Sequence, residues 1–328
     1  MNGPPLDNSV FSIEEKMNFL GKNRVPFLFV ISYDKKKGTV LPLSKIPPDI
    51  LYDVNGIRNF KEKKKVTGGS VGSRNPVPFH IYRTAFDSII DEIVQGNSYV
   101  ANLTFPTEIH PDISLENIFM KARAPFRLLY QDRFVTFSPE RFVSISGTRI
   151  NTFPMKGTID ASLSGAEKKI INDEKEMAEH VMIVDLLRND LSMVARNVQV
   201  DRFRYTDKII TSGGPLLQIS SEISGSLDTN WHQSIGTLMM TLLPAGSITG
   251  APKKSTVEIL QRVEQDNRGF YTGVFGVFTG TGLDSAVMIR FIEKEKETAR
   301  FKSGGGITID SNPEDEYREL LQKVYLPF

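Results

Sequence analysis

A stretch near the middle of the chain places one lysine directly after a predicted strand. It reads Thr148-Arg149-Ile150-Asn151-Thr152-Phe153-Pro154-Met155-Lys156-Gly157-Thr158. Residues 148–153 alternate polar and apolar side chains, which predicts a half-buried strand. Pro154 cannot donate to the ladder, and Gly157 favours a tight turn where backbone can approach a ligand closely. A lysine held away from water there can act as a nucleophile, whereas the same turn on the surface is an ordinary hairpin, and this stretch alone leaves both readings open.

The composition is that of a soluble globular protein. Of the 328 residues, 40% are hydrophobic and 24% are charged, and the length allows one large domain or two ordinary ones. A net charge of +1 does not provide the excess positive charge that is typical of proteins that bind nucleic acid or an anionic membrane. No apolar run approaches the roughly 20 residues of a membrane span, and the start of the chain lacks the basic and apolar regions of a signal peptide. We therefore expect a cytoplasmic protein with neither nucleic-acid nor membrane partners.

The chain has no cysteine, which excludes disulfides, thiolate nucleophiles, cysteine-bound zinc and iron–sulfur clusters. Its four histidines are His80, His110, His180 and His232, and no two of them show the i, i+4 spacing of a zinc-binding helix. A metal bound by this chain is therefore expected to be a hard cation held by carboxylates.

Helices and strands alternate along the chain without a repeating unit. Residues 25–43 read as a β-hairpin, and residues 56–76, rich in glycine, lysine and arginine, read as an exposed linker. Beyond them, the patterns predict helices at 82–95, 172–196, 232–243 and 253–266, strands at 98–105, 271–280, 284–293 and 298–302, three short strands within 133–153, and a closing helix. Strands outnumber clean βαβ units, which favours an α+β fold over a doubly wound sheet. We place a short N-terminal region at 1–76, as part of the same fold, and the main region at 77–328.

Two predicted helices carry pairs of glutamates. In the helix at 172–196, Glu176 and Glu179 lie three residues apart on one face, and Glu179 sits a turn inside, beside the apolar stripe. Asp173 and Glu176 also have the spacing of a capping box, which explains Glu176 without any ligand. A like-charged pair in such a place usually needs a counter-cation.

The closing helix repeats this pattern. Asn312 can cap it, and Pro313 suits its first turn. Its charged residues Glu316, Glu319 and Lys323 recur on one side. Taken alone, this is a solvated face with a Glu319–Lys323 ion pair. Two carboxylate pairs in a chain without cysteine nevertheless favour a Mg²⁺ ion shared between the two helices.

Two glycine-containing segments can bind an anion. Gly304, Gly305 and Gly306 follow a predicted strand and expose backbone N–H groups, although a plain loop explains them equally well. Residues 246–253 open a helix whose N-terminus can also hold an anion, and their spacing is not that of a Walker loop.

Seven segments, in order, resemble motifs of the chorismate-utilising enzymes, and among these the aminodeoxychorismate synthases. They are residues 138–142 (SPERF), 154–158 (PMKGT), 179–190 (EHVMIVDLLRND), 246–253 (GSITGAPK), 284–290 (DSAVMIR) and 304–307 (GGGI), together with the helix that carries Glu316, Glu319 and Lys323. The resemblance covers residues 77–328. It implies one α+β domain of two packed, antiparallel-rich sheets flanked by helices, with chorismate and Mg²⁺ in a cleft between the sheets.

The resemblance also assigns roles to single residues. It implies that Glu179, Glu316 and Glu319 hold Mg²⁺, that Glu176 lies near it through water, and that the metal grips the ring carboxylate of chorismate close to Lys323. The other implied substrate-binding residues are Gly157, Thr158, Gln218, Ser247, Tyr271, Arg290, Gly304, Gly305 and Gly306. Among them, Arg290, Tyr271 and the three glycine amides are assigned to the enolpyruvyl carboxylate. A dianionic substrate needs such cations and N–H donors.

Lys156 separates the subfamilies in this resemblance, because anthranilate synthases carry a small residue at its position. Its implied role is covalent addition to the ring as the C4 hydroxyl leaves, with Glu140 acting as general acid and then as base. Ammonia then gives 4-amino-4-deoxychorismate, a precursor of 4-aminobenzoate and folate, and a glutamine amidotransferase partner is expected to supply it. Two positions depart from the family pattern: Val100 replaces a glutamine or lysine, and Gln218 replaces a histidine.

Two other interpretations remain open on the sequence. One is a different chorismate transformation that forms anthranilate or isochorismate, and identification of the product discriminates it. The other is a non-catalytic homologue that binds chorismate-like acids. Retention of Lys156, Glu140 and all the metal carboxylates argues against the second, since a protein that only binds has no need of a general acid.

Overall fold

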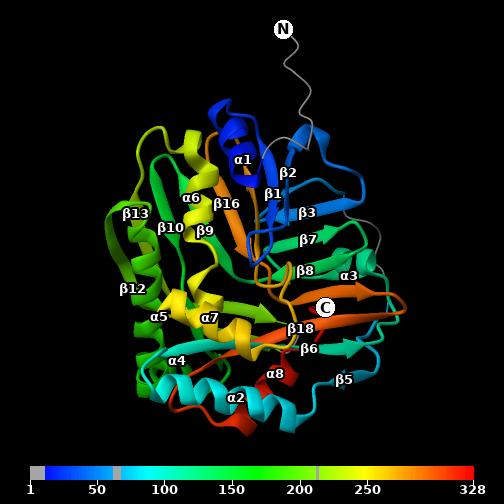
Figure 1. Ribbon diagram of the computed structural model, residues 1–328, viewed down its shortest axis with the longest axis vertical. Helices are drawn as coiled ribbons and strands as arrows, with labels where there is room; N and C mark the ends of the chain where they lie inside the picture. Colours follow the sequence, from blue (N-terminus) through cyan, green and yellow to red (C-terminus); the bar gives the residue numbers. More distant parts are fainter. Residues whose placement is uncertain (1–11, 62–67, 212–213) are drawn as a thin grey trace.

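Two antiparallel β-sheets packed against each other form the centre of the protein, and helices surround them (Figure 1). The computed structural model describes residues 12–61, 68–211 and 214–328, with the side chains of Lys156, Thr158, Lys175 and residues 209–211 outside the description. Each sheet has nine strands within these ranges. The predicted α+β class and the pair of packed antiparallel sheets are therefore confirmed.

The first sheet has the strand order β11-β13-β10-β9-β16-β15-β1-β2, with β12 paired to β13. Its strands are β1 (Phe27–Ile31), β2 (Gly38–Pro42), β9 (Arg141–Ser146), β10 (Arg149–Thr152), β11 (Met155–Asp160), β12 (Arg196–Thr211), β13 (Gly214–Ser226), β15 (Val274–Phe278) and β16 (Leu283–Val287). The predicted hairpin at 25–43 and the short strands within 133–153 are confirmed. The long β12–β13 hairpin was not predicted, because β12 is rich in charged residues and register shifts interrupt its pairing.

The second sheet has the strand order β14-β6-β18-β17-β8-β7-β3-β4, with β5 paired to β6. Its strands are β3 (Ile50–Val54), β4 (Ile57–Arg58), β5 (Arg74–Pro76), β6 (Val100–Ile109), β7 (Phe126–Tyr130), β8 (Phe134–Ser138), β14 (Gly250–Ala251), β17 (Phe291–Glu295) and β18 (Thr298–Ile307). Residues 27–58 therefore contribute strands to both sheets.

Eight α-helices within the described residues pack around the sheets. They are α1 (Ile13–Lys22), α2 (Phe79–Val94), α3 (Leu115–Lys121), α4 (Ala166–Ile171), α5 (Glu174–Ser192), α6 (Ile235–Leu242), α7 (Lys253–Val263) and α8 (Pro313–Gln322), with 3₁₀ turns at Leu43–Lys45, Trp231–Ser234 and Gly246–Ile248. The predicted helix caps are present: the Asp173 side chain accepts a hydrogen bond from Glu176 N in α5, and the Asn312 side chain accepts from Glu314 N and Asp315 N in α8. α5 lies against β11, β12 and β13, whereas α8 and α2 lie against β18 of the other sheet.

Apolar side chains from both sheets meet in a shared core. Leu28 and Phe275 from the first sheet pack in one cluster with Phe134 and Phe291 from the second. The rings of Phe134 and Phe291 stack with their centroids 4.9 Å apart. Burial of each such side chain stabilises the fold by about 1.5–3 kcal/mol, so this core fixes the two sheets relative to each other.

The chain passes between the sheets at two adjacent places. Residues 139–140 connect β8 to β9, and residues 288–290 connect β16 to β17. The two connections are hydrogen-bonded together, because Val287 N donates to the Glu140 carbonyl at 3.2 Å and Phe137 N donates to the Arg290 carbonyl at 3.2 Å. The single strand predicted at 284–293 is therefore wrong: the chain changes sheet there, and Arg290 takes a left-handed φ of 52°.

Two glycine segments also differ from their predictions. Gly304, Gly305 and Gly306 lie inside β18, paired with β6, and not in a loop after a strand. Gly157 lies inside β11, where the pairing with β13 shifts register between Met155 and Thr158, so the predicted tight turn is instead a β-bulge within a strand. Gly157 still needs its left-handed freedom, since its φ is 82°.

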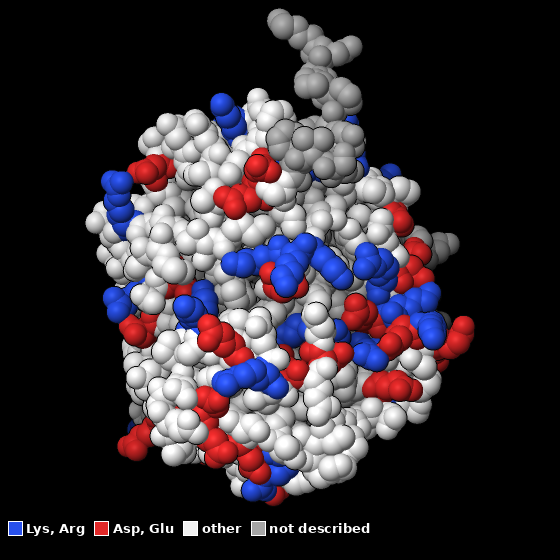
Figure 2. Space-filling model, in the orientation of Figure 1, with Lys and Arg blue, Asp and Glu red and all other residues white. Residues whose placement is uncertain are grey.

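The surface carries both signs of charge. Lys and Arg side chains gather near the middle of the face drawn in Figure 2, and acidic and basic side chains alternate around them. This distribution agrees with the net charge of +1. Among the described residues, no helix combines the length and the apolar character that crossing a membrane requires.

Candidate active site

A cavity of about 120 Å³ lies between the two sheets. Its wall consists of Val100, Asn102, Glu140, Arg141, Phe142, Thr152, Phe153, Pro154, Met155, Glu179, Met182, Ile183, Leu187, Gly246, Ser247, Gly250, Gly306 and Thr308. Strands β6 and β18 supply one side, strands β9 and β10 supply another, and α5 closes it. The cavity therefore brings together Glu140, Glu179, Ser247 and Gly306, four residues that the sequence places far apart.

Glu140 is the buried acid of this cavity. It lies on the connection between β8 and β9, and its Oε1 accepts a hydrogen bond from Ser247 Oγ at 2.5 Å. Burial raises the pKa of the Glu140 carboxyl above its ordinary range, while the Ser247 hydrogen bond and the positive charges of Arg290 and Lys323 oppose that rise. A carboxyl in such a place can carry a proton at a pH where an exposed glutamate is ionised, as a general acid must.

The β11 bulge borders the same cavity. Pro154 and Met155 form part of the wall, and the backbone of Lys156 and Gly157 follows directly. The side chains of Lys156 and Thr158 lie outside the described part of the structure. A Cβ built on Gly157 would lie 2.8 Å from Glu176 Oε2, so α5 packs closely on this bulge. The bulge thus holds the lysine backbone at the edge of the cavity, between β13 and α5.

Of the two pairs of helix glutamates, the pair on α5 lies at the cavity and the pair on α8 lies near the glycine segment of β18. Glu179, on α5, lies in the cavity wall, and Glu176 lies one turn earlier against Gly157. On α8, Glu316 accepts a hydrogen bond from Ser311 Oγ at 2.8 Å. The predicted ion pair between Glu319 and Lys323 is confirmed, with 2.7 Å between Oε1 and Nζ.

The glycine strand connects α8 to the cavity. Lys323 Nζ donates to the Gly304 carbonyl at 2.7 Å, and a Cβ built on Gly305 would lie 3.4 Å from Glu316 Oε2. Phe291, the first residue of β17, pairs with Lys302, so residues 303–307 of β18 have β6 as their only described strand neighbour. Alternate residues of an antiparallel strand direct their N–H groups to opposite sides, so some of these amides face away from β6. They are suited to hold a carboxylate.

Arg290 and Tyr271 lie beside Glu140 but are not part of the cavity wall. Arg290 lies on the second connection between the sheets, and its Nε donates weakly to Tyr325 Oη at 3.4 Å. Tyr271 is buried, its ring lies 5.9 Å from that of Phe291, and burial raises its pKa despite the nearby Arg268 and Arg290. A tyrosine in this state stays neutral and can donate a hydrogen bond to an anion.

Gln218 belongs to the strand pairing behind the bulge. It lies on β13, opposite Thr158 of β11 and Asp207 of β12, and it is outside the cavity wall. Val100, the other departure from the family pattern, does line the cavity and contributes only apolar surface there.

The donor chemistry of the site is that of Mg²⁺, which takes oxygen ligands and commonly uses one or two protein carboxylates, completing its shell with water and substrate. Within the described part of the chain, no group of three or more histidine, aspartate and glutamate side chains is close enough together to hold a metal ion. Glu319 is moreover engaged with Lys323. Glu179 in the cavity wall and Glu316 beside Gly305 have the donor chemistry that Mg²⁺ uses, and the substrate can supply further oxygens. Mg²⁺ itself stays a prediction.

Several contacts and residues that shape the site were missed from the sequence. Glu140 and Ser247 were both named, but their mutual hydrogen bond spans 107 positions and no local pattern indicates it. Arg141, in the wall, forms a two-bonded ion pair with Asp284 at 2.9 and 3.0 Å. Arg268 and Glu264, whose i, i+4 spacing was the one available signal, form a buried ion pair behind the cavity.

Comparison with known proteins places this geometry in a family. Residues 51–327 match the family model described as chorismate binding enzyme. The fold resembles that of MenF, the menaquinone-specific isochorismate synthase of Escherichia coli, with a TM-score of 0.71 over 91% of this chain and 77% of that one. The two sequences are 15% identical, so this likeness concerns the fold alone.

Curated relatives carry three different names. An uncharacterized PabA-like protein of Haemophilus influenzae is 51% identical over 95% of each chain. Component 1 of anthranilate synthase from Archaeoglobus fulgidus is 34% identical over 74% of this chain and 61% of its own length. Component 1 of aminodeoxychorismate synthase from Bacillus subtilis is 31% identical over 81% of this chain and 58% of its own length.

Proposed function

The chain belongs to the chorismate-binding enzyme family, and from this premise we propose that it converts chorismate and ammonia into 4-amino-4-deoxychorismate. The observation that carries the proposal is the buried carboxyl of Glu140, whose pKa is raised and which shares its cavity with the strand leading into Lys156. A general acid beside a lysine is what removal of a ring hydroxyl by an amine requires. The lysine also favours this reaction over formation of anthranilate, in line with the subfamily resemblance.

The chemistry proceeds in two balanced steps. The neutral amine of Lys156 forms a C–N bond to the ring while the C4–O bond breaks, and Glu140 gives its proton to the hydroxyl, which leaves as water. Ammonia then forms the C4–N bond as the bond to the lysine nitrogen breaks, and Glu140 takes the proton that the new ammonium group loses. The net change replaces a hydroxyl by an amino group and releases water, so no oxidant or reductant is needed.

The substrate is held by its two carboxylates. Arg290, Tyr271 and amides of the β18 glycine segment bind the enolpyruvyl carboxylate, and Lys323 lies close to the ring carboxylate. Glu179 and Glu316 would hold Mg²⁺, Glu176 and Glu319 would add their negative charge to the site, and the ion would supply positive charge for the ring carboxylate. Without such a charge, the carboxylates of α5 and α8 would repel a dianionic ligand.

The chain itself uses free ammonia. Hydrolysis of glutamine needs a nucleophile of the cysteine type, and the sequence has no cysteine. We therefore propose that a glutamine amidotransferase partner supplies ammonia to this chain. The 4-amino-4-deoxychorismate that this chain forms then serves as a precursor of 4-aminobenzoate and folate.

The decisive test is intact mass spectrometry of the chain after incubation with chorismate and Mg²⁺ but without ammonia. We expect a chorismate-derived adduct that is mapped to Lys156 and is absent from Lys156→Ala. The same variant is expected to lose formation of the 4-amino product from chorismate and ammonium. Lys208→Ala, which removes an exposed lysine on the neighbouring β12, serves as the control and should keep both.

Two results would contradict the proposal. A Lys156→Ala variant that still forms 4-amino-4-deoxychorismate at near the parental rate would exclude the covalent route. Anthranilate or isochorismate as the main product of the parent chain would assign it a different chorismate transformation.

A further inference from the structure

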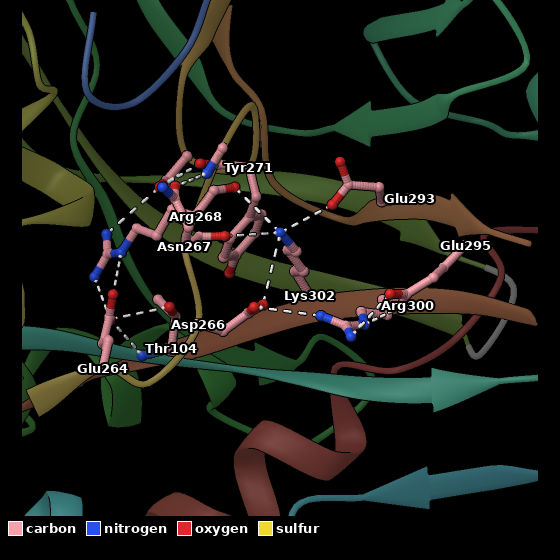
Figure 3. A network of polar contacts seen from close by, with 12 residues as sticks. Thr104, Glu264, Asp266, Asn267, Arg268, Tyr271, Glu293, Glu295, Arg300 and Lys302 are labelled. Atoms are coloured by element: carbon pink, nitrogen blue, oxygen red, sulfur yellow. Dashed lines mark hydrogen bonds and ion pairs between the residues drawn. The ribbon is translucent and has the colours of Figure 1, made fainter. Parts of the chain in front are cut away.

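A buried arginine lies behind the wall of the active-site cavity. Arg268 follows α7 in the loop that leads to Tyr271 and β15, and it is only 4% exposed. Figure 3 shows its side chain reaching from this loop to Glu264, with Thr104 on the far side of that carboxylate and Lys302 held against the same loop. No role in the reaction assigned above depends on it.

All five N–H donors of Arg268 are in use. Nε and Nη2 donate to the two Glu264 carboxylate oxygens at 2.8 and 2.6 Å. Nη2 also donates to the Asn102 carbonyl at 2.6 Å, while Nη1 donates to the Ile248 carbonyl at 2.7 Å and reaches Thr272 Oγ1 at 3.5 Å. Only a guanidinium presents five donors in a fixed planar fork, so no other side chain can reproduce this set.

The Ile248 carbonyl belongs to the short 3₁₀ turn Gly246–Ile248, which carries Ser247. Each residue of this turn is held by a different partner. Gly246 packs against Asp190, since a Cβ built on it would lie 2.8 Å from Asp190 Oδ2, and Asp190 pairs with Lys253 at 2.8 Å. The Ser247 hydroxyl donates to Glu140. Ile248 is held by Arg268 from the opposite side. Two buried ion pairs thus clamp the residues on either side of the serine.

We propose that Arg268 is a positioning residue, which acts through Ile248 and Asn102 to hold the Ser247 hydroxyl against the carboxyl of Glu140. Asn102 strengthens this link, because it lines the cavity and its own amide donates to the Thr249 carbonyl at 2.8 Å. Glu264 fixes the guanidinium in turn and is itself held by the Thr104 amide and hydroxyl, at 3.0 and 2.9 Å. The inference rests on the proposed role of Glu140 as general acid.

The test follows the titration of Glu140 directly, without substrate, so its outcome does not depend on which product the enzyme forms. The measurement is the pH titration of the ¹³C-labelled Glu140 carboxyl by NMR, assigned with Glu140→Gln. Ser247→Ala is expected to raise the titration midpoint, because the hydroxyl hydrogen bond favours the ionised form. The charged groups around Glu140, namely Arg290, Lys323, Arg141 and Glu179, stay in place in these variants.

Arg268→Lys keeps the charge but has three donors in place of five. We expect it to raise the midpoint in the same direction as Ser247→Ala, and the double variant to show no shift beyond that of Ser247→Ala alone. In turnover, kcat is expected to fall roughly 10²-fold, as for other small misplacements of a reacting group, with KM nearly unchanged. If Arg268→Lys does not fold, Glu264→Gln carries the test, since it retains Arg268 but removes the charge that orients it.

The matched control is Lys302→Gln. Lys302 is equally buried in the network of Figure 3 and pairs with Glu293 at 3.0 Å. It donates to the carbonyls of Asn267 and Arg268 at 3.1 and 3.3 Å, so it supports the same loop, but it does not contact Ile248 or Asn102. It should lower stability and leave the Glu140 midpoint unchanged. An unchanged midpoint in folded Arg268→Lys or Glu264→Gln would overturn the proposal. So would an additive double variant, or an equal shift in Lys302→Gln, which would indicate general loosening.

Discussion

At the scale of single residues, the burial of Glu140 makes the free energy of unfolding depend on pH. Its folded-state pKa lies above the value of about 4.3 that an unfolded glutamate has. The unfolded chain therefore loses this proton at lower pH than the folded chain does. The stabilisation is complete below about pH 4 and is lost as the pH rises through the folded-state pKa.

Glu140→Gln tests this linkage, because glutamine has a similar size and never ionises. We expect the variant to match the parent in free energy of unfolding near pH 4 and to exceed it near pH 8. The gain should be about 1.4 kcal/mol for each unit by which the pKa is raised. Denaturant unfolding across this range measures it, and a variant that is no more stable than the parent near pH 8 would show that the carboxyl ionises without penalty.

The same residues show what sequence reasoning reaches at this scale. Glu140, Glu179, Ser247 and Gly306 were named from motifs, and all four lie in the cavity wall. Arg268 was not named, because it lies beyond the helix predicted at 253–266 and its i, i+4 spacing from Glu264 was the one local signal. Its proposed role depends on hydrogen bonds to the backbone carbonyls of Asn102 and Ile248. Every residue type has such a carbonyl, so the sequence does not indicate these contacts.

At the scale of elements, the β11 bulge is the feature on which the proposed chemistry depends. Gly157→Ala places a Cβ at a φ of 82° and 2.8 Å from Glu176 Oε2. We expect a loss of more than about 1 kcal/mol of stability from the strained backbone. Because the Glu176 carboxylate must turn away and the bulge must adjust, we also expect a fall in kcat of roughly 10²-fold. Unfolding curves and turnover measure the two effects.

Gly147→Ala separates backbone strain from the displacement of the Glu176 side chain. Gly147 lies between β9 and β10 with a φ of 59°, and a Cβ there meets no atom within 4 Å. This variant should lose about 1 kcal/mol and keep its kcat. If both variants lose activity equally, the contact between Gly157 and Glu176 has no special role.

Elements were predictable where local chemistry defines them. The caps of α5 and α8 and the hairpin of β1 and β2 were read correctly from adjacent residues. The bulge in β11 and the break after β16 were not, because both depend on partner strands: β13 sets the register of β11, and residues 288–290 leave one sheet to join the other. The apolar pattern of Val287 to Ile292 continues through the break and gives no sign of it.

At the scale of the whole molecule, the site exists because two sheets meet. Glu140, the proposed general acid, and Arg290 lie on the two adjacent connections between the sheets. Glu179 lies on the helix that packs against the first sheet, and Glu316 lies on the helix that packs against the second. Neither sheet alone carries a complete set of groups for a dianionic substrate. The sequence motifs named these residues, and the resemblance implied a cleft between two sheets. Neither indicated which element carries which residue, because that follows from strand pairing over long distances in the chain.

This division predicts how ligands affect stability. A Mg²⁺ ion and chorismate that bind between Glu179 and Glu316 join the two halves, and a ligand that binds only the folded state stabilises it by about 2.7 kcal/mol at 100 times its dissociation constant. We expect Mg²⁺ and chorismate together, without ammonia, to raise the melting temperature by roughly 5 °C, and each alone to raise it much less. Thermal unfolding measures this without turnover.

Variants on α5 and α8 test whether the bound ligand contacts both helices. Glu179→Gln and Glu316→Gln should each lose the joint shift, because either one removes a carboxylate from its own side of the cleft. Glu314→Gln is the control on α8, since Glu314 is exposed and lies 3.6 Å from Arg83. A full shift in excess chelator would exclude the metal, and a loss in only one of the two glutamate variants would place the ligand on one helix. Loss in both, with Glu314→Gln unchanged, is the result that a ligand shared between the two sheets requires.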